Sequence, residues 1–271
     1  MAFLLVLAAA FAVIAVLLFQ PAWVARRRRR LRSQPLSPAQ RAIVARNVPM
    51  AARLPATLAR RLEGDMQVFL AEKAFCGCAG FEVTDEVRVT IAAQASLLAL
   101  GRGAGFPRLS QVLVYPGAFV VERLRPEPSG ILQEQRQVLS GESWVQGQVV
   151  LSWEDVLAGS RDPDDGRNVV LHEFAHQLDQ EKGYANGAPW VPGRERRQRW
   201  SEVFARSYAL LQARAGAGLP SLLSDYGATA PAEFFAVACE VFFERPADLA
   251  LEDPQLYAEL RGFLRVDPLS W

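Results

Sequence analysis

The sequence predicts an α+β domain preceded by one N-terminal transmembrane helix. Segments rich in β-branched and aromatic residues come before most of the segments with helical periodicity. Strands and helices separated along the chain are typical of α+β folds, whereas regular alternation would predict an α/β fold. The transmembrane helix is predicted from an uninterrupted apolar run at the start of the chain.

Residues 1–19 contain no charged side chain, and a helix of this length, at about 1.5 Å per residue, just spans a hydrocarbon core of about 30 Å. Six arginines follow within residues 26–32, so the positive-inside rule places the remainder of the chain in the cytoplasm. We therefore expect a single-pass protein of the inner (cytoplasmic) membrane. A cleavable signal peptide fits less well, because its positive charge would precede the apolar run. The expected organisation is a transmembrane anchor (1–25), a basic juxtamembrane linker (26–55) and one domain (56–271).

The charge distribution argues against a nucleic-acid-binding protein. The chain has 30 basic and 29 acidic side chains, and without the six arginines of the basic run only 24 basic side chains remain. That run adjoins an apolar segment, where arginines typically contact anionic lipid headgroups. We expect no direct binding of nucleic acid, since no basic stripe is left to contact phosphates.

The elements of the predicted domain follow from periodicity and from Pro and Gly positions. Helices are expected first at residues 56–75 and 84–100. Strands are expected next, at 111–115, at 118–122 after a Pro-Gly turn, and at 147–153. The remaining helices are expected around residue 172 and at 195–215, 231–244 and 254–264.

The chain has only two histidines, His172 and His176, and both lie in the sequence HEFAH. On a helix, residues four apart lie on one face, so the two imidazoles can bind one metal ion while Glu173 contacts a water on that ion. The apolar flanks support a helix, which Asp165 or Asn168 could cap. The alternative is an ordinary helix with two hydrogen-bonded histidines. Catalysis by histidine elsewhere in the chain is excluded.

A catalytic zinc site usually has three protein ligands. Because no third histidine exists, the third ligand is a carboxylate or, less suitably, a thiolate. The candidates weighed are Asp179, Glu233, Glu240 and Cys239. Glu233 begins an apolar helix, but a glutamate in a first helical turn also interacts favourably with the helix dipole, so spacing alone leaves both interpretations open. Tyr226 is equally open: it could stabilise an oxyanion or simply pack at a turn.

The chain resembles the Mlc titration factor A family of zinc metallopeptidases. The resemblance rests on residues 84–98 (TDEVRVTIAAQASLL), 112–121 (VLVYPGAFVV), 141–153 (GESWVQGQVVLSW), 168–179 (NVVLHEFAHQLD) and 226–243 (YGATAPAEFFAVACEVFF). It implies a zincin-like metallopeptidase domain with a catalytic core similar to that of anthrax lethal factor. It further implies that His172, His176 and Glu233 bind one Zn²⁺ per chain and that Tyr226 assists catalysis.

These observations predict a zinc peptidase that acts on peptide or protein substrates, with Glu173 as general base. The family resemblance favours aminopeptidase-like action. The strand at 147–153 directly precedes the helix with the histidines, so we expect it to border the cleft and pair with an extended substrate. The alternative function is a regulator that sequesters a transcriptional repressor or a membrane partner. A purely structural zinc site is a further alternative, although such a site needs no base beside His172.

Overall fold

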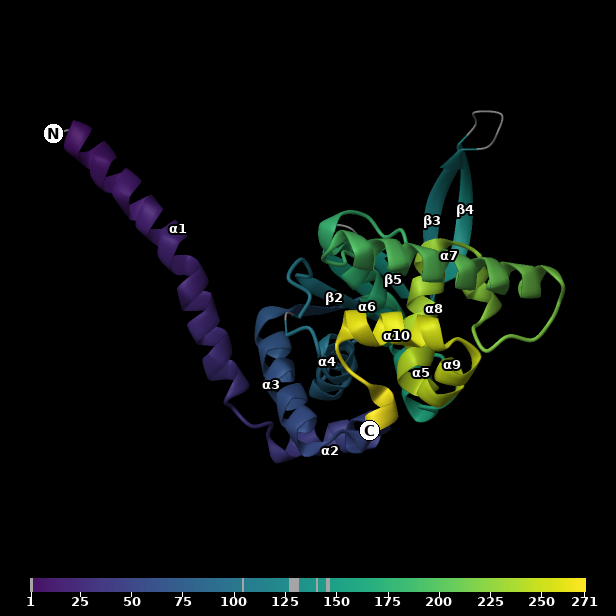
Figure 1. Cartoon of the computed structure of the whole chain (residues 1–271). Helices are drawn as coiled ribbons and strands as arrows, with labels where there is room; N and C mark the ends of the chain where they lie inside the picture. The colour runs from purple at the N-terminus through teal and green to yellow at the C-terminus, as the bar shows by residue number, and fades with distance from the viewer. Residues whose placement is uncertain (1, 104, 127–131, 140, 145–146) are drawn as a thin grey trace.

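The computed structural model describes residues 2–103, 105–126, 132–139, 141–144 and 147–271 (Figure 1). Its α-helices are α1 (Ala2–Arg32), α2 (Pro38–Asn47), α3 (Ala56–Glu72), α4 (Asp85–Ala99), α5 (Trp153–Arg161), α6 (Val169–Asp179), α7 (Arg194–Gly216), α8 (Pro231–Glu244), α9 (Pro246–Glu252) and α10 (Pro254–Leu264). Short 3₁₀ helices are η1 (Pro49–Arg53), η2 (Gln180–Lys182), η3 (Asp225–Ala228) and η4 (Pro268–Ser270). The strands are β1 (Ala74–Gly77), β2 (Gln111–Tyr115), β3 (Phe119–Pro126), β4 (Leu132–Leu139), β5 (Gly141–Trp144) and β6 (Gln148–Ser152).

The structure is mainly helical, and its main sheet has the strand order β1-β2-β6-β5. Strands β1, β2 and β6 are parallel, and β5 pairs antiparallel with β6. Helix α4 connects β1 to β2, as a parallel pair requires a crossover. The predicted α+β arrangement, with strands first and helices later, is therefore wrong. The error began at β1, because the helix expected at 56–75 ends at Glu72 and Ala74 pairs with Gln111 of β2.

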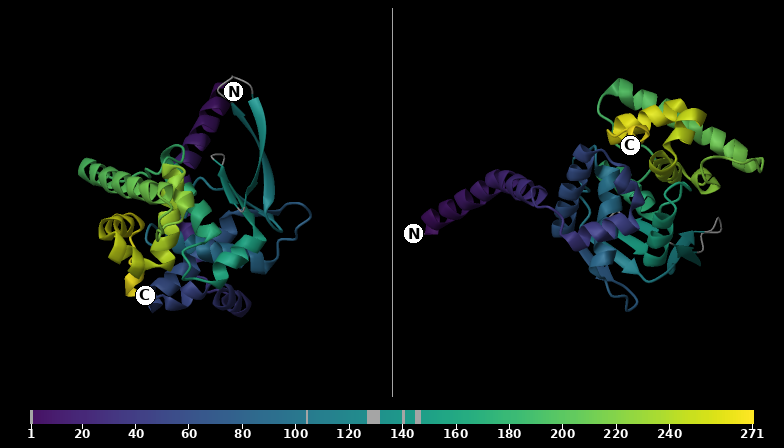
Figure 2. Two further views of the ribbon diagram at one scale, coloured as in Figure 1. Left: turned by 90° about the vertical axis from the view of Figure 1, so that its right-hand side faces the viewer. Right: turned by 90° about the horizontal axis from the view of Figure 1, so that it is seen from below.

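Strand β6 is an inner strand, flanked by β2 on one side and β5 on the other. Its backbone is therefore already paired, and the expectation that residues 147–153 would pair with a substrate is wrong. The edge position belongs to β5. Strands β3 and β4 form a separate antiparallel ribbon that stands out from the rest of the domain (Figures 1 and 2).

The core is built around α6, which packs against α4 on one side and α8 on another. Phe174 of α6 is fully buried and its ring lies 4.8 Å from that of Phe106, edge to face. Phe234 and Phe235 of α8 are equally buried. Helix α8 begins with Pro231 in its first turn, where a missing backbone N–H costs nothing. The two helices that carry the candidate site are thus both anchored in the core.

The predicted transmembrane anchor is wrong. The apolar run does not form a separate helix: α1 continues through Pro21 into the arginines. Two of these guanidinium groups pair with α3, Arg28 with Glu72 at 2.7 Å and Arg32 with Asp65 at 2.7 Å. Among the described residues, which exclude Met1, no helix is sufficiently long and apolar to cross a membrane. The single-pass inner-membrane location and the membrane as a partner depended on this helix and are withdrawn with it.

Candidate metal centre

Helix α6 presents the two histidines side by side. Asn168 caps the helix, because its side-chain oxygen accepts hydrogen bonds from the backbone N–H groups of Val170 (3.1 Å) and Leu171 (3.0 Å). His172 and His176 follow one turn apart, with ring centroids separated by 4.9 Å and ring planes at 83°. Both side chains are about one-tenth exposed. The helical spacing expected from the sequence is therefore realised in the structure.

Helix α8 brings Glu233 to both imidazoles. The Oε2 atom of Glu233 lies 3.0 Å from Nε2 of His172 and 3.4 Å from Nε2 of His176. One potential ligand atom from each of the three residues lies within 4.8 Å of the other two. Two imidazole nitrogens and one carboxylate oxygen are a donor set typical of catalytic zinc. The described side chains therefore fit a single metal ion, with Glu233 in the place of the third ligand.

The other three candidates for the third ligand lie elsewhere. Glu240 contacts the opposite nitrogen of His172, Nδ1, at 2.8 Å. Asp179 accepts hydrogen bonds from the backbone N–H groups of Asn186 (2.7 Å) and Gly187 (2.6 Å), so it holds the loop after α6. Cys239 is fully buried, and burial raises the pKa of its thiol well above the usual value. It is a core residue.

Charges in the site are strongly coupled. Burial lowers the pKa of His172, but hydrogen bonds with Glu233 and Glu240 outweigh burial and raise this pKa well above its usual value. Burial likewise raises the pKa of Glu233, but the two histidines outweigh it and hold the pKa far below its ordinary range. The carboxylate is therefore ionised and faces positive charge. A metal ion bound at these residues would replace the proton that lies between His172 and Glu233.

Glu173 lies next to the histidines on α6 but is not among the three residues whose potential ligand atoms cluster. It is buried, and its Oε2 atom has no hydrogen-bond partner in the described part of the chain. Burial raises the pKa of this carboxyl group. Gly141 of β5 lies directly against it: a Cβ atom on Gly141 would come within 2.5 Å of Glu173 Oε1. The requirement for glycine at this position was not recognised from the sequence, because it depends on a contact between a strand and a helix.

Tyr226 lies on η3, next to the histidines. Its backbone N–H donates to Ser224 Oγ, and its carbonyl accepts from the hydroxyl of Thr229 at 2.7 Å. Gly227 packs against Val237 of α8, which attaches η3 to the helix of Glu233. The Tyr226 ring centroid is 5.8 Å from that of His172, and the side chain is 48% exposed. The structure thus places Tyr226 at the solvent side of the histidines.

A cavity of about 620 Å³ opens over these residues. Its lining includes His172, Glu173, Tyr226 and Glu240, and Gly141 lies at its border with β5. This volume is in the range of sites that bind small molecules or peptide side chains. The cavity gives a molecule of this size access to Glu173 and His172.

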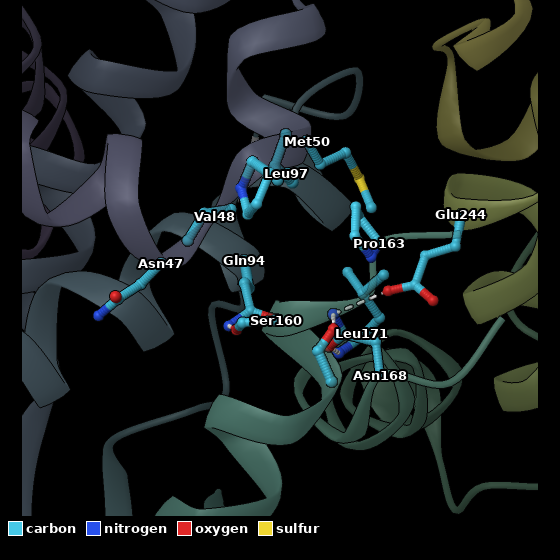
Figure 3. A pocket seen from close by; sticks show the side chains of 12 residues that line it. Asn47, Val48, Met50, Gln94, Leu97, Ser160, Pro163, Asn168, Leu171 and Glu244 are labelled. Atoms are coloured by element: carbon cyan, nitrogen blue, oxygen red, sulfur yellow. Dashed lines mark hydrogen bonds between the residues drawn. The ribbon is translucent and has the colours of Figure 1, made fainter. Parts of the chain in front are cut away.

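A second, much smaller cavity of about 10 Å³ also has Asn168 in its lining (Figure 3). Glu244 of α8 enters it and accepts a hydrogen bond from the Asn168 side chain at 3.1 Å. Burial raises the pKa of Glu244 to about 8. Apolar side chains such as Met50 and Leu97 form part of the wall. A cavity of this volume is too small to hold a substrate. The raised pKa of Glu244 favours the protonated form of its carboxyl group at neutral pH.

The model of the glucose-regulated metallo-peptidase M90 family matches residues 23–265 of the chain. An uncharacterized protein of Synechocystis is 40% identical over 98% of this chain and 97% of its own length. Mlc titration factor A of Klebsiella pneumoniae is 35% identical over 82% of this chain and 84% of its own length. Mlc titration factor A of Pectobacterium atrosepticum is 34% identical over 83% of this chain and 85% of its own length.

The chain belongs to the M90 metallo-peptidase family, and the resemblance seen in the sequence is confirmed. Membership supports a metallopeptidase-type enzyme that uses a metal ion. The ligands, the base and the assisting tyrosine remain predictions, for which the geometry described above is the physical support.

Proposed function

From this family membership, we propose that the protein is a zinc-dependent peptidase in which His172, His176 and Glu233 bind one Zn²⁺. The observation that carries the proposal is that Glu233 Oε2 lies 3.0 Å from Nε2 of His172 and 3.4 Å from Nε2 of His176. On the same helix as the histidines, Glu173 Oε2 is buried and has no hydrogen-bond partner in the described part of the chain. A structural zinc site needs no such base. The choice of zinc follows from the two-histidine, one-carboxylate donor set.

Each side chain of the proposed site has a separate role in hydrolysis. Bound zinc would lower the pKa of a water molecule and polarise the scissile carbonyl group. Glu173 takes the proton of the attacking water on its free Oε2 atom and later delivers it to the leaving amine. Burial raises the pKa of Glu173, which makes its carboxylate a stronger base for the first step. The Tyr226 hydroxyl donates a hydrogen bond to the oxyanion.

The edge strand β5 is the element best placed to align a peptide. Gly141 begins β5 and lies against Glu173, while Ser143 accepts a hydrogen bond from Gln177 of α6 at 2.7 Å. Strand β5 is thus fixed beside the metal helix, and its far edge is not paired in the sheet of described strands. An extended substrate can pair with this edge and place its scissile bond above Glu173.

A second function is favoured by the relatives. Proteins named Mlc titration factor A match most of this chain at 34–35% identity. We therefore retain binding of the repressor Mlc, or of a related regulator, as the alternative function. In that case peptidase activity would be secondary.

The decisive experiment compares the wild type with Glu173→Gln. The variant keeps the metal ligands, so zinc content should stay at one per chain while hydrolysis of a peptide library falls about 10²–10⁴-fold. Peptides with free and acetylated N-termini distinguish aminopeptidase from endopeptidase action, and we expect preference for the free amine. A wild type that binds zinc but cleaves no peptide would refute the peptidase proposal. Repressor binding that survives Glu173→Gln would then favour the alternative.

A further inference from the structure

Glu240 of α8 connects His172, in the candidate metal site, to Asn168 at the start of α6. One of its carboxylate oxygens, Oε1, lies 2.8 Å from Nδ1 of His172. The other, Oε2, accepts a hydrogen bond from the backbone N–H of Asn168 at 2.5 Å. Asn168 is the residue that caps α6. Both oxygens of this buried carboxylate are therefore engaged, and both engage α6.

The two histidines differ in this respect. His172 has a carboxylate on each ring nitrogen, Glu240 on Nδ1 and Glu233 on Nε2. The Nδ1 atom of His176 is buried and has no hydrogen-bond partner among the described residues. Within the described part of the chain, His172 is thus the one imidazole whose Nδ1 atom contacts a side chain.

We propose that Glu240 is a positioning residue, which holds the proton of His172 on Nδ1 and directs the lone pair of Nε2 towards the metal. Accepting a hydrogen bond from a ligand histidine fixes its tautomer and ring orientation and increases its basicity. The Asn168 N–H in turn fixes Glu240, so hydrogen bonds connect the start of α6, His172 and α8. This inference rests on the proposed function to the extent that His172 is a metal ligand.

Glu244 provides a matched control. It lies one turn beyond Glu240 on α8, is buried, and also contacts Asn168, but through the Asn168 side chain. It makes no contact with either histidine among the hydrogen bonds of the described residues. Replacing each carboxyl group by the amide of the same shape therefore separates contact with His172 from general packing between α8 and Asn168.

The test measures zinc affinity of the full chain by competition with a chromophoric chelator, for wild type, Glu240→Gln and Glu244→Gln. We expect Glu240→Gln to weaken zinc binding about 10–100-fold and Glu244→Gln to change it less than about 3-fold. An equal loss in both variants, or an unchanged affinity in Glu240→Gln, would overturn the proposal. Thermal melting of the metal-free proteins controls for folding. Because affinity is measured without a substrate, absence of peptidase activity in the wild type would contradict the proposed function and leave this result interpretable.

Nuclear magnetic resonance gives a second readout that needs no variant. The chain has only two histidines, so ¹⁵N-labelled histidine gives two imidazole spin systems. In the zinc-loaded wild type we expect His172 to carry its proton on Nδ1 and to show a strongly hydrogen-bonded signal that His176 lacks. Two equivalent imidazoles, or a proton on Nε2 of His172, would contradict the proposal even if Glu240→Gln failed to fold.

Discussion

Helix α8 supplies a carboxyl group to each of two cavities that share Asn168 in their lining, and the carboxyl groups near them differ in pKa. Glu240 and His172 line the larger one, of about 620 Å³. Glu233 lies beside it, against His172 and His176, and the two histidines lower the pKa of Glu233. In the smaller one, of about 10 Å³, Glu244 meets an asparagine and apolar side chains, and its pKa rises to about 8. Burial acts in the same direction on Glu233 and Glu244.

The difference lies in the partner that each carboxyl group meets. A buried carboxylate stays ionised where cationic groups compensate for the loss of water, and takes up a proton where they do not. We therefore propose the cation site at Glu233 and the histidines, beside the larger cavity, whereas Glu244 at the smaller cavity takes part in packing between α8 and the start of α6. The predictions below test this division, from the largest expected effect to the smallest.

Replacing Glu233 by alanine should have the largest effect. The substitution removes the proposed third ligand. Zinc affinity should therefore fall by more than the roughly 10–100-fold expected for a residue that hydrogen-bonds to a ligand, such as Glu240. Hydrolysis should be lost together with the zinc. Zinc content after dialysis and peptide cleavage measure the two effects. The control is Glu195→Ala, which removes an exposed glutamate from the first turn of α7. If Glu233→Ala retained zinc as the control does, Glu233 would be a helix-dipole glutamate and not a ligand.

Tyr226→Phe should reduce kcat about 10²–10³-fold, because only the hydroxyl that would donate to the oxyanion is removed. Zinc affinity and folding should remain those of the wild type, since the ring and the η3 backbone are unchanged. Steady-state kinetics with the best peptide substrate measure the effect. Tyr208→Phe is the control, because its hydroxyl bonds the carbonyl of Ala228 on the same short helix, outside the lining of the larger cavity. Equal losses in both variants would assign Tyr226 a structural role.

Gly141→Ala should reduce kcat about 10-fold or more, since general-base catalysis is worth about 10²–10⁴-fold and the new methyl group displaces the base. The clash is with side-chain atoms of Glu173, at 2.5 Å from Oε1. Zinc binding should persist because the ligands are not touched. Gly216→Ala, where a Cβ meets no atom within 4 Å, is the control. An unchanged kcat in Gly141→Ala would show that Glu173 does not act from the position seen here.

Glu244→Gln should stabilise the protein without affecting catalysis by more than a few-fold. Between the ordinary pKa of 4.5 and the folded value of about 8, the unfolded chain has lost this proton while the folded chain keeps it. The free energy of unfolding therefore falls as pH rises through this window, by about 1.4 kcal/mol per pKa unit for an isolated group. The amide resembles the protonated carboxyl group, so the variant should lack this decline.

Urea unfolding of the metal-free protein at several pH values between 5 and 8 measures the effect. Wild type and Glu244→Gln should have similar stability near the lower end of the range and diverge as pH rises. Parallel pH profiles for the two proteins would mean that Glu244 is ionised in the folded state, and the proposed difference between the two cavities would fail.

Local sequence signals predicted the helices of the site well. Helices 231–244 and 254–264 were predicted with the bounds that α8 and α10 have, because a proline in the first turn marks the start of each. The spacing of His172 and His176 was sufficient to place both imidazoles on one face. The same reasoning failed where partners are distant in the chain, as in the parallel pairing of β1 with β2 and the ion pairs between α1 and α3. It also missed the place of β5 against the base.

The sequence by itself determined that any histidine chemistry occurs at one helical turn, since both histidines of the chain lie there, and that the third ligand is not a histidine. Helical periodicity acts over four residues and is readable without a structure. The family resemblance implied Glu233, but only the tertiary structure shows where Glu233 and Glu240, two turns apart on one helix, lie relative to the histidines. Packing of α8 against α6 directs Glu233 to the Nε2 atoms and Glu240 to Nδ1 of His172. Which carboxylate faces the two Nε2 atoms depends on how two helices that are distant in the chain pack together, and the residue spacing within either helix does not determine this packing.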